Sequence, residues 1–265
     1  MEITYITVNT ANVLGEWRAE VEHFYETQGT KAVLEKLNTN SAVMITGNSG
    51  IGKTATMRYV SLLFEERGYK VVLISSPDEI PLHRFPERKQ LFIMDDIIGK
   101  YRVDSVAVEL WRKFHDRLKV VFKDTKVKLL STLRRQLYID MSSILFPTVF
   151  SSTIVDLESN NLVLSSNEKR GMLTNYMKRR KISENYDDNE LLKICSCQFA
   201  FPLLCNLFTT NQEFLKMRLK FFESPSIVFI EELNRLQIEN KTTWILCVLR
   251  IDFRFVRTTN FQKNG

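Results

Sequence analysis

The chain has 265 residues, 44% of them hydrophobic and 26% charged, with nine glycines, six prolines and a net charge of +6. This composition excludes collagen-like, low-complexity and disordered classes, and the length allows one large domain or two modest ones. The longest apolar runs, such as Trp244–Leu249, are about a third of a membrane span, and the N-terminus lacks a signal-peptide pattern. The four cysteines are too few for a disulfide framework and predict reduced thiols in a cytoplasmic protein.

The first half of the chain alternates between strand and helix patterns. A helix is predicted around Trp17–Tyr25, and from about residue 30 to 165 short apolar runs alternate with helical periodicity, which is typical of an α/β domain with a parallel sheet. Runs this continuously apolar suit strands that are buried on both faces. The predicted strands are Ala42–Thr46, Lys70–Ser75, Leu91–Met94, Val127–Ser131 and Ser152–Asp156, and the predicted helices between them are Lys53–Arg67 and Ser105–Phe122.

After Leu164 the pattern becomes helical. Ser165 and Glu168 form a capping-box pattern that predicts the start of a helix. Further helices are predicted over about 187–196, 202–209, 211–222 and 226–237.

The positive charge is concentrated in this second part. Residues 1–160 hold 21 Lys and Arg against 20 Asp and Glu, whereas residues 161–265 hold 16 against 11. The densest run is Lys178–Lys181, which could bind nucleic acid or act as a nuclear signal. We favour the solvated end of an amphipathic helix, because no interleaved aromatic residues accompany the run.

The stretch Gly47–Thr54 matches the phosphate-loop (P-loop) pattern G-x-x-x-x-G-K-[ST], between a predicted strand and a predicted helix. Its glycines let consecutive backbone N–H groups face the phosphates, and the helix N-terminus adds partial positive charge. We expect Lys53 to bind the same oxygens and the Thr54 hydroxyl to ligate Mg²⁺. The predicted nucleotide-binding residues are Gly47, Asn48, Ser49, Gly50, Ile51, Gly52, Lys53, Thr54 and Ala55.

Two acids follow a later strand, as a P-loop site requires. The apolar run Leu91–Met94 leads into Asp95 and Asp96. Asp95 is predicted to hold the Mg²⁺, and Asp96 to orient or deprotonate the attacking water as the catalytic acid. A pair of acids in an ordinary turn is the alternative reading.

The fourth predicted strand ends in polar and basic residues. Ligands bind at the carboxyl ends of the strands in an open parallel sheet, where Thr132 and Arg134 would lie. Arg134 is therefore a candidate γ-phosphate sensor, with a solvated basic turn as the alternative, and Arg135 is expected to be exposed.

These motifs together resemble the STAND class, the signal-transduction ATPases with numerous domains, and most closely the group called novel STAND NTPase 3. The resemblance rests on Gly47–Thr54, on the stretch Gln90–Tyr101 with its Asp-Asp-x-x-Gly-Lys pattern, and on Leu129–Arg134. The helix with Trp111 and the stretch Phe201–Cys205 add to it, so that it covers roughly residues 20–240.

The resemblance implies a three-layer P-loop NTPase fold with five parallel strands and the additional-strand topology. On this basis we expect a helical lead-in over 1–30, a nucleotide-binding domain over 31–165, a helical lid over 166–222 and a partial, truncated winged-helix-like region over 223–265. It also implies a slow ATPase, closed with ADP and open with ATP, that uses Mg²⁺, forms nucleotide-dependent homo-oligomers and acts with protein partners in signalling or innate immunity.

One further residue is carried over from the resemblance. Pro202 corresponds to the lid proline that packs near adenine, although Ala200 replaces the usual residue two positions earlier. A helix-initiating proline is the alternative.

Three other functions remain open from the sequence. A small-molecule or nucleoside kinase shares the phosphate loop, but the paired Asp95 and Asp96 and the long helical part argue against it. A scaffold that holds ADP without hydrolysis differs from the switch only in turnover. A nucleic-acid remodeller draws only on the basic second part and is disfavoured.

Overall fold

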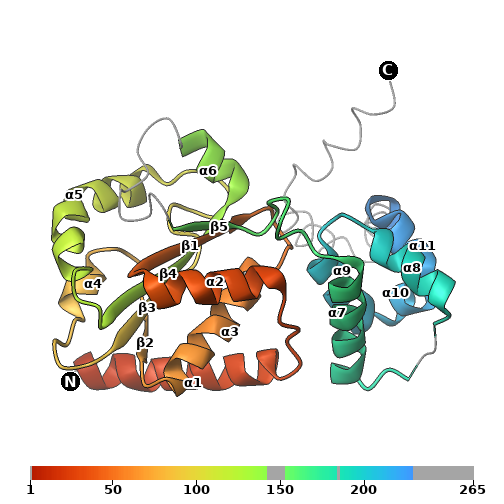
Figure 1. Cartoon of the computed structure of the whole chain (residues 1–265), viewed down its shortest axis with the longest axis horizontal. Helices are drawn as coiled ribbons and strands as arrows, with labels where there is room; N and C mark the ends of the chain where they lie inside the picture. The colour runs from red at the N-terminus through yellow and green to blue at the C-terminus, as the bar shows by residue number, and fades with distance from the viewer. Residues whose placement is uncertain (1, 142–152, 184–185, 229–265) are drawn as a thin grey trace, which may run out of the picture.

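A computed structural model of the chain describes residues 2–141, 153–183 and 186–228. Its centre is a sheet of five parallel strands in the order β2-β3-β4-β1-β5 (Figure 1). The fourth strand thus lies between the strand before the phosphate loop and the strand before the paired acids, which confirms the additional-strand topology. The strands are β1 (Ala42–Gly47), β2 (Lys70–Leu73), β3 (Gln90–Met94), β4 (Val127–Arg134) and β5 (Ile154–Asp156).

Helices cover both faces of the sheet, which completes the three-layer architecture of a P-loop NTPase. One face packs against α1 (Glu2–Val21), α2 (Gln28–Thr39) and α3 (Lys53–Glu66). The opposite face packs against α4 (Glu79–Leu82), α5 (Ser105–Val121) and α6 (Arg135–Met141).

Strand alternation divides the core between these two layers. Val43 and Ile45 of β1 join the cluster with α1, α2 and α3, whereas Ala42 and Met44 join the cluster with α5. Successive side chains of a strand point to opposite faces, so a strand buried on both faces must be apolar throughout. This explains why the strands read as continuous apolar runs.

The C-terminal described part is helical and has its own core. It comprises α7 (Ser166–Arg179), α8 (Asp188–Ser196), α9 (Phe201–Thr210), α10 (Gln212–Met217) and α11 (Leu219–Glu223), gathered beside one end of the sheet (Figure 1). Phe208, Phe221 and Phe222 pack together at its centre with ring centroids 5.0–5.7 Å apart. The capping box predicted for α7 is present, with Ser165 and Glu168 bonding each other's backbone.

The elements differ from the sequence predictions in several places. The first helix ends at Val21 rather than at Tyr25, and the segment predicted over 211–222 breaks at Arg218, which has a φ of 50°. The sequence did not predict α2, α4 or α6. The reasons are that α2 buries only a narrow apolar face, that α4 is short, and that α6 follows β4 without a turn residue. The winged-helix-like prediction for 223–265 lies mostly outside the described residues. In the described part, no helix has the length and apolarity needed to cross a membrane.

Candidate nucleotide-binding site

The phosphate loop connects β1 to α3 and is fixed from inside by its own lysine. Lys53 Nζ donates hydrogen bonds to the carbonyl oxygens of Gly47 at 2.9 Å and Asn48 at 2.8 Å. An ammonium has three hydrogens, and two of them are held by the loop. Burial lowers the pKa of Lys53, while the carboxylate of Asp96 opposes this shift. The lysine is therefore a pre-positioned charge in a dehydrated site.

The tip of the loop contacts the helical part directly. Gly50 O accepts a hydrogen bond from Leu203 N at 3.1 Å. Gly50 has a φ of +83°, and a Cβ atom there would lie 3.0 Å from Cβ of both Ala200 and Leu203. Both its backbone conformation and this close approach therefore require glycine.

The hydroxyl and carboxylate predicted to hold Mg²⁺ lie together. Thr54 Oγ1 donates to the Asp95 carboxylate at 3.1–3.2 Å, and the Thr132 hydroxyl donates to the same carboxylate. In the described part, no group of three or more His, Cys, Asp or Glu side chains could hold a metal. One hydroxyl and one carboxylate suit Mg²⁺, which keeps waters and takes phosphate oxygens as further ligands.

Asp96 differs from Asp95 in backbone and environment. It has a φ of 51°, and its N–H donates to Thr132 Oγ1 at 2.9 Å. Burial and the neighbouring Asp95 raise the pKa of Asp96, and the cations Arg134 and Lys53 oppose the rise. A half-buried carboxylate of raised pKa beside the predicted Mg²⁺ ligands has the chemistry of a general base.

The turn after these acids is fixed against the sheet and α5. Ile97 N donates to Thr132 O at 3.1 Å, and the Trp111 indole donates to Ile97 O at 3.2 Å. Gly99 has a φ of +107°, and a Cβ atom there would lie 2.3 Å from Arg102 O. The glycine of the Gly-Lys extension thus has a structural reason, since only glycine fits this turn.

The two arginines at the end of β4 point to different partners. Arg134 pairs in register with Gly47, and its guanidinium lies 4.7 Å from the ring centroid of Tyr101. Arg135 forms an ion pair with Asp156 at 3.4 Å and lines the cavity described below. The Arg135 side chain is 43% exposed, in line with the expectation, although the residue begins α6 instead of lying in a turn.

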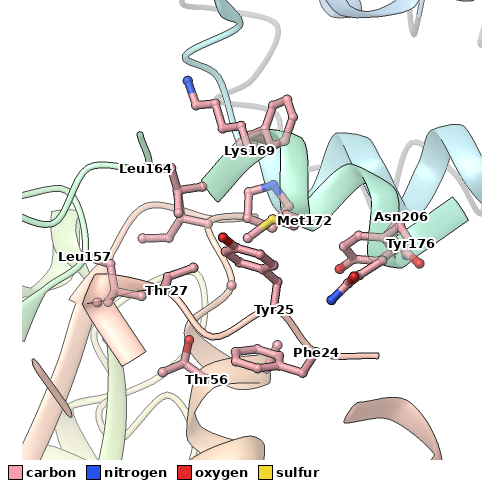
Figure 2. Close-up of a pocket in the computed structure, with 18 of the residues that line it drawn as sticks. Phe24, Tyr25, Thr27, Thr56, Leu157, Leu164, Lys169, Met172, Tyr176 and Asn206 are labelled. Atoms are coloured by element: carbon pink, nitrogen blue, oxygen red, sulfur yellow. The ribbon is translucent and has the colours of Figure 1, made fainter. Parts of the chain in front are cut away.

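A cavity of about 700 Å³ opens beside the loop, between the sheet and the helical part. Of the phosphate loop, Ile51, Gly52 and Thr54 line this cavity, and Asp95 is joined to it through Thr54. We call residues 47–54 together with Asp95 and Asp96 the phosphate end. The far end is lined by aromatic and aliphatic side chains from three separate segments (Figure 2). Those that define it are Tyr25, Leu157, Leu164, Met172 and Tyr176. Burial raises the pKa of Tyr176 to about 12, which keeps its phenol neutral.

The far end is bordered by contacts of α7 with the end of α1 and the start of α2. Gln28 N donates to Glu168 Oε1 at 2.7 Å, and Arg179 Nη1 donates to Glu20 O at 2.9 Å. Between them Tyr25 lies against Gly171, where a Cβ atom would lie 2.1 Å from Tyr25 Cε2. The basic run that begins at Lys178 thus includes a residue that bonds to the end of α1.

The structure brings most of the predicted site residues together and adds others. Pro202 is in the first turn of α9, and its ring lies 3.7–3.8 Å from the position that a Cβ atom on Gly52 would take. Sequence reasoning did not assign Tyr25, Leu157, Met172 or Tyr176 to the site. The unexplained glycine at 171, within a predicted helix, was the signal available for Tyr25.

Comparisons with known proteins agree with this architecture. The sequence model of the family Novel STAND NTPase 3 matches residues 24–179. AMPPCP-bound DnaA from Aquifex aeolicus is 14% identical over 80% of this chain and 72% of its own, with a TM-score of 0.50. A DNA replication initiation factor is 18% identical, over 82% of this chain and 69% of its own, with a TM-score of 0.50.

At these identities the solved structures are similar in fold alone. No curated protein matches the chain. The family match, by contrast, spans more than half of the 265 residues and includes the phosphate loop, both acids and β4. The chain belongs to the Novel STAND NTPase 3 family.

Proposed function

We propose that the chain binds Mg-ATP in this cavity, hydrolyses it slowly and uses the nucleotide state to set the position of its helical part. The observation that carries the proposal is the hydrogen bond from Leu203 N to Gly50 O. Through it the tip of the phosphate loop contacts the first turn of α9, beside Ile51 and Pro202, which line the cavity. A loop that shifts when a γ-phosphate binds or leaves would therefore strain or release α9.

Each end of the cavity suits a different part of the nucleotide. Backbone N–H groups from Gly47 to Ala55, with Lys53, suit the phosphates. Thr54 and Asp95 would hold Mg²⁺, Asp96 would activate water, and Arg134 would contact the γ-phosphate. The aromatic and aliphatic far end suits a purine, with Pro202 between the two.

The regulatory part of the proposal rests on family membership. In this proposal the protein is closed with ADP, and it is open and forms homo-oligomers with ATP. The transition serves intracellular signalling or defence. A ligand shifts such an equilibrium only by its difference in affinity for the two states. That difference in affinity would arise at the two contacts between the sheet domain and the helical part, from Gly50 to Leu203 and from Glu168 to Gln28.

Nucleotide binding is tested first with Lys53→Ala. Titration with a fluorescent ATP analogue and Mg²⁺ is expected to show an affinity loss of about 100-fold or more, since a buried charge-assisted contact to phosphate is removed. Lys113→Ala, at an exposed lysine of α5, is the matched control and should bind as the wild type does. Tight binding by Lys53→Ala would reject the site assignment.

The switch is tested by identifying the co-purified nucleotide and measuring particle size. We expect ADP in the purified protein, a monomer with ADP and a larger species with a non-hydrolysable ATP analogue. Light scattering would detect the change. Equal sizes in both states would reject oligomerisation as the output while leaving nucleotide binding intact.

A further inference from the structure

The turn that follows β5 reaches over the start of the phosphate loop. Its Glu158 carboxylate accepts two hydrogen bonds from one residue, the backbone N–H of Asn48 at 2.7 Å and the Asn48 side-chain amide at 2.9 Å. Residue 158 is 110 positions away in the sequence. A carboxylate that accepts from two donors in parallel fixes orientation as well as distance.

The turn itself is held by neighbouring elements. Leu157 N donates to Thr46 O at 3.1 Å, which continues the pairing of β5 with β1. The Asp156 carboxylate accepts from Glu158 N at 3.0 Å and forms the ion pair with Arg135. Because the sheet and α6 together fix the turn, Glu158 is an anchor rather than a side chain that adapts to the loop.

The anchored residue is one of the two that hold the loop lysine. The carbonyl oxygens of Gly47 and Asn48 both accept from Lys53 Nζ. If Asn48 were released, its peptide plane could turn and that acceptor would be lost. We infer that Glu158 is a positioning residue, which acts through Asn48 to hold Lys53 at the phosphate position; this inference rests on the proposed nucleotide site.

A second effect of Glu158 has the opposite sign. Its negative charge lies near the place where phosphates would bind and also contributes to the electrostatic environment of Lys53. If that charge dominated, removing it would strengthen ATP binding because like charges repel. The positioning role instead predicts weaker binding when the hydrogen bonds are lost and little change when only the charge is lost.

Two substitutions separate these effects. Glu158→Ala removes both hydrogen bonds and is expected to weaken Mg-ATP binding roughly 10-fold. In Glu158→Gln the amide oxygen accepts from Asn48 N–H, and the Asn48 side chain can turn so that its oxygen accepts from the new amide. We therefore expect Glu158→Gln to bind within about 2-fold of the wild type.

Calorimetric titration with Mg-ATP gives the affinities, and thermal melting without nucleotide checks that each variant folds. Glu87→Ala, at an exposed glutamate, is the control for a general loss of negative charge. Wild-type affinity in Glu158→Ala, tighter binding in both variants, or equal weakening in both would each overturn the inference.

A double substitution that exchanges the amide and the carboxylate of residues 48 and 158 keeps the test decisive if Glu158→Ala does not fold. Asn48→Asp places a carboxylate against Glu158 and should weaken binding. In Asn48→Asp/Glu158→Gln the backbone N–H of residue 48 again donates to residue 158, and the side-chain hydrogen bond is restored with donor and acceptor exchanged. Recovery in the double variant supports the inference, and its absence rejects it. Lys53→Ala in the same titration separates the two proposals: tight binding there rejects the nucleotide site itself, whereas loss there with no effect at Glu158 rejects only the positioning role.

Discussion

The phosphate end and the far end of the cavity are built in different ways. The phosphate end comes from stretches that are continuous in the sequence, Gly47–Thr54 and the pair Asp95–Asp96, each directly after a strand. The far end comes from single side chains such as Tyr25, Leu157 and Met172, spread over almost 150 residues. Binding phosphate requires backbone N–H groups in a fixed order, whereas holding an apolar group requires only shape and area.

This difference predicts that single substitutions act most strongly at the phosphate end, and the largest effect is expected for Asp96→Asn. Loss of the proposed base should slow phosphate release by about 100-fold to 1,000-fold. Nucleotide affinity should be retained, because the amide removes a half-buried charge without changing the shape of the site. Rates of phosphate release and affinities from titration measure the two separately.

Asp116→Asn is the matched control for this substitution, since the Asp116 side chain is 97% exposed on α5. Unchanged turnover in Asp96→Asn would show that the charge of Asp96 is not used in hydrolysis. The phosphate end would then bind nucleotide without supplying the base.

The junction of the two ends is tested by Gly50→Ala. Gly68→Ala is an unusually close control, because Gly68 has a φ of +82° against +83° for Gly50, while a Cβ atom at 68 would meet nothing within 4 Å. Both variants carry the same left-handed strain of about 1–2 kcal/mol. Only Gly50→Ala also crowds Ala200 and Leu203, which adds about 1–3 kcal/mol.

Urea unfolding gives the difference between these two variants, and hydrogen exchange shows where it arises. In Gly50→Ala the Leu203 amide should exchange faster, since its hydrogen bond to Gly50 O is lost. Equal destabilisation and equal exchange in the two variants would mean that the contact between the phosphate loop and α9 contributes nothing.

The sequence predicted the continuous stretches of the phosphate end better than the dispersed side chains of the far end. The strands were predictable because burial on both faces demands apolar runs, and the loop and acids because their chemistry fixes residue types at fixed spacing. The helix α6 was not, since Arg134 and Arg135 continue from strand to helix without a turn residue. The hydrogen bonds between Asn48 and Glu158 were not predictable either. These residues meet only because the order of strands in the sheet places β5 beside β1, and no sequence motif marks that order.

The far end is tested by Gly171→Ala, for which an effect of intermediate size is expected. In a helix this change normally stabilises by about 0.5–1 kcal/mol. At Gly171 the new Cβ would overlap the ring of Tyr25, so we expect a loss of about 1–3 kcal/mol instead. Gly15→Ala is the matched control, since Gly15 is exposed in α1 with open space around it and should show the normal gain.

Unfolding free energies measure both glycine variants, and titration with Mg-ATP measures whether the displaced ring affects binding. We expect Gly171→Ala to weaken binding and Gly15→Ala to leave it unchanged. A stabilised Gly171→Ala variant would mean that Tyr25 moves aside freely, and the far end would then be a loose surface rather than a built pocket.

The smallest expected effect concerns the single hydrogen bonds that close the far end. Burial alone would raise the pKa of Glu168, but the N–H groups of Gln28 and Ser165 hydrogen-bond its carboxylate and lower the pKa below its ordinary value. A folded-state pKa below the unfolded one contributes stability above the unfolded pKa, and this contribution is lost as pH falls through the folded pKa. Glu168→Gln should therefore lower the free energy of unfolding by about 1 kcal/mol at neutral pH, with a deficit that shrinks toward zero below about pH 4. Urea titrations at pH 7 and pH 3.5 measure this change, with Glu87→Gln as the exposed control. A deficit that is the same at both pH values would mean that shape, not charge, joins α7 to the start of α2.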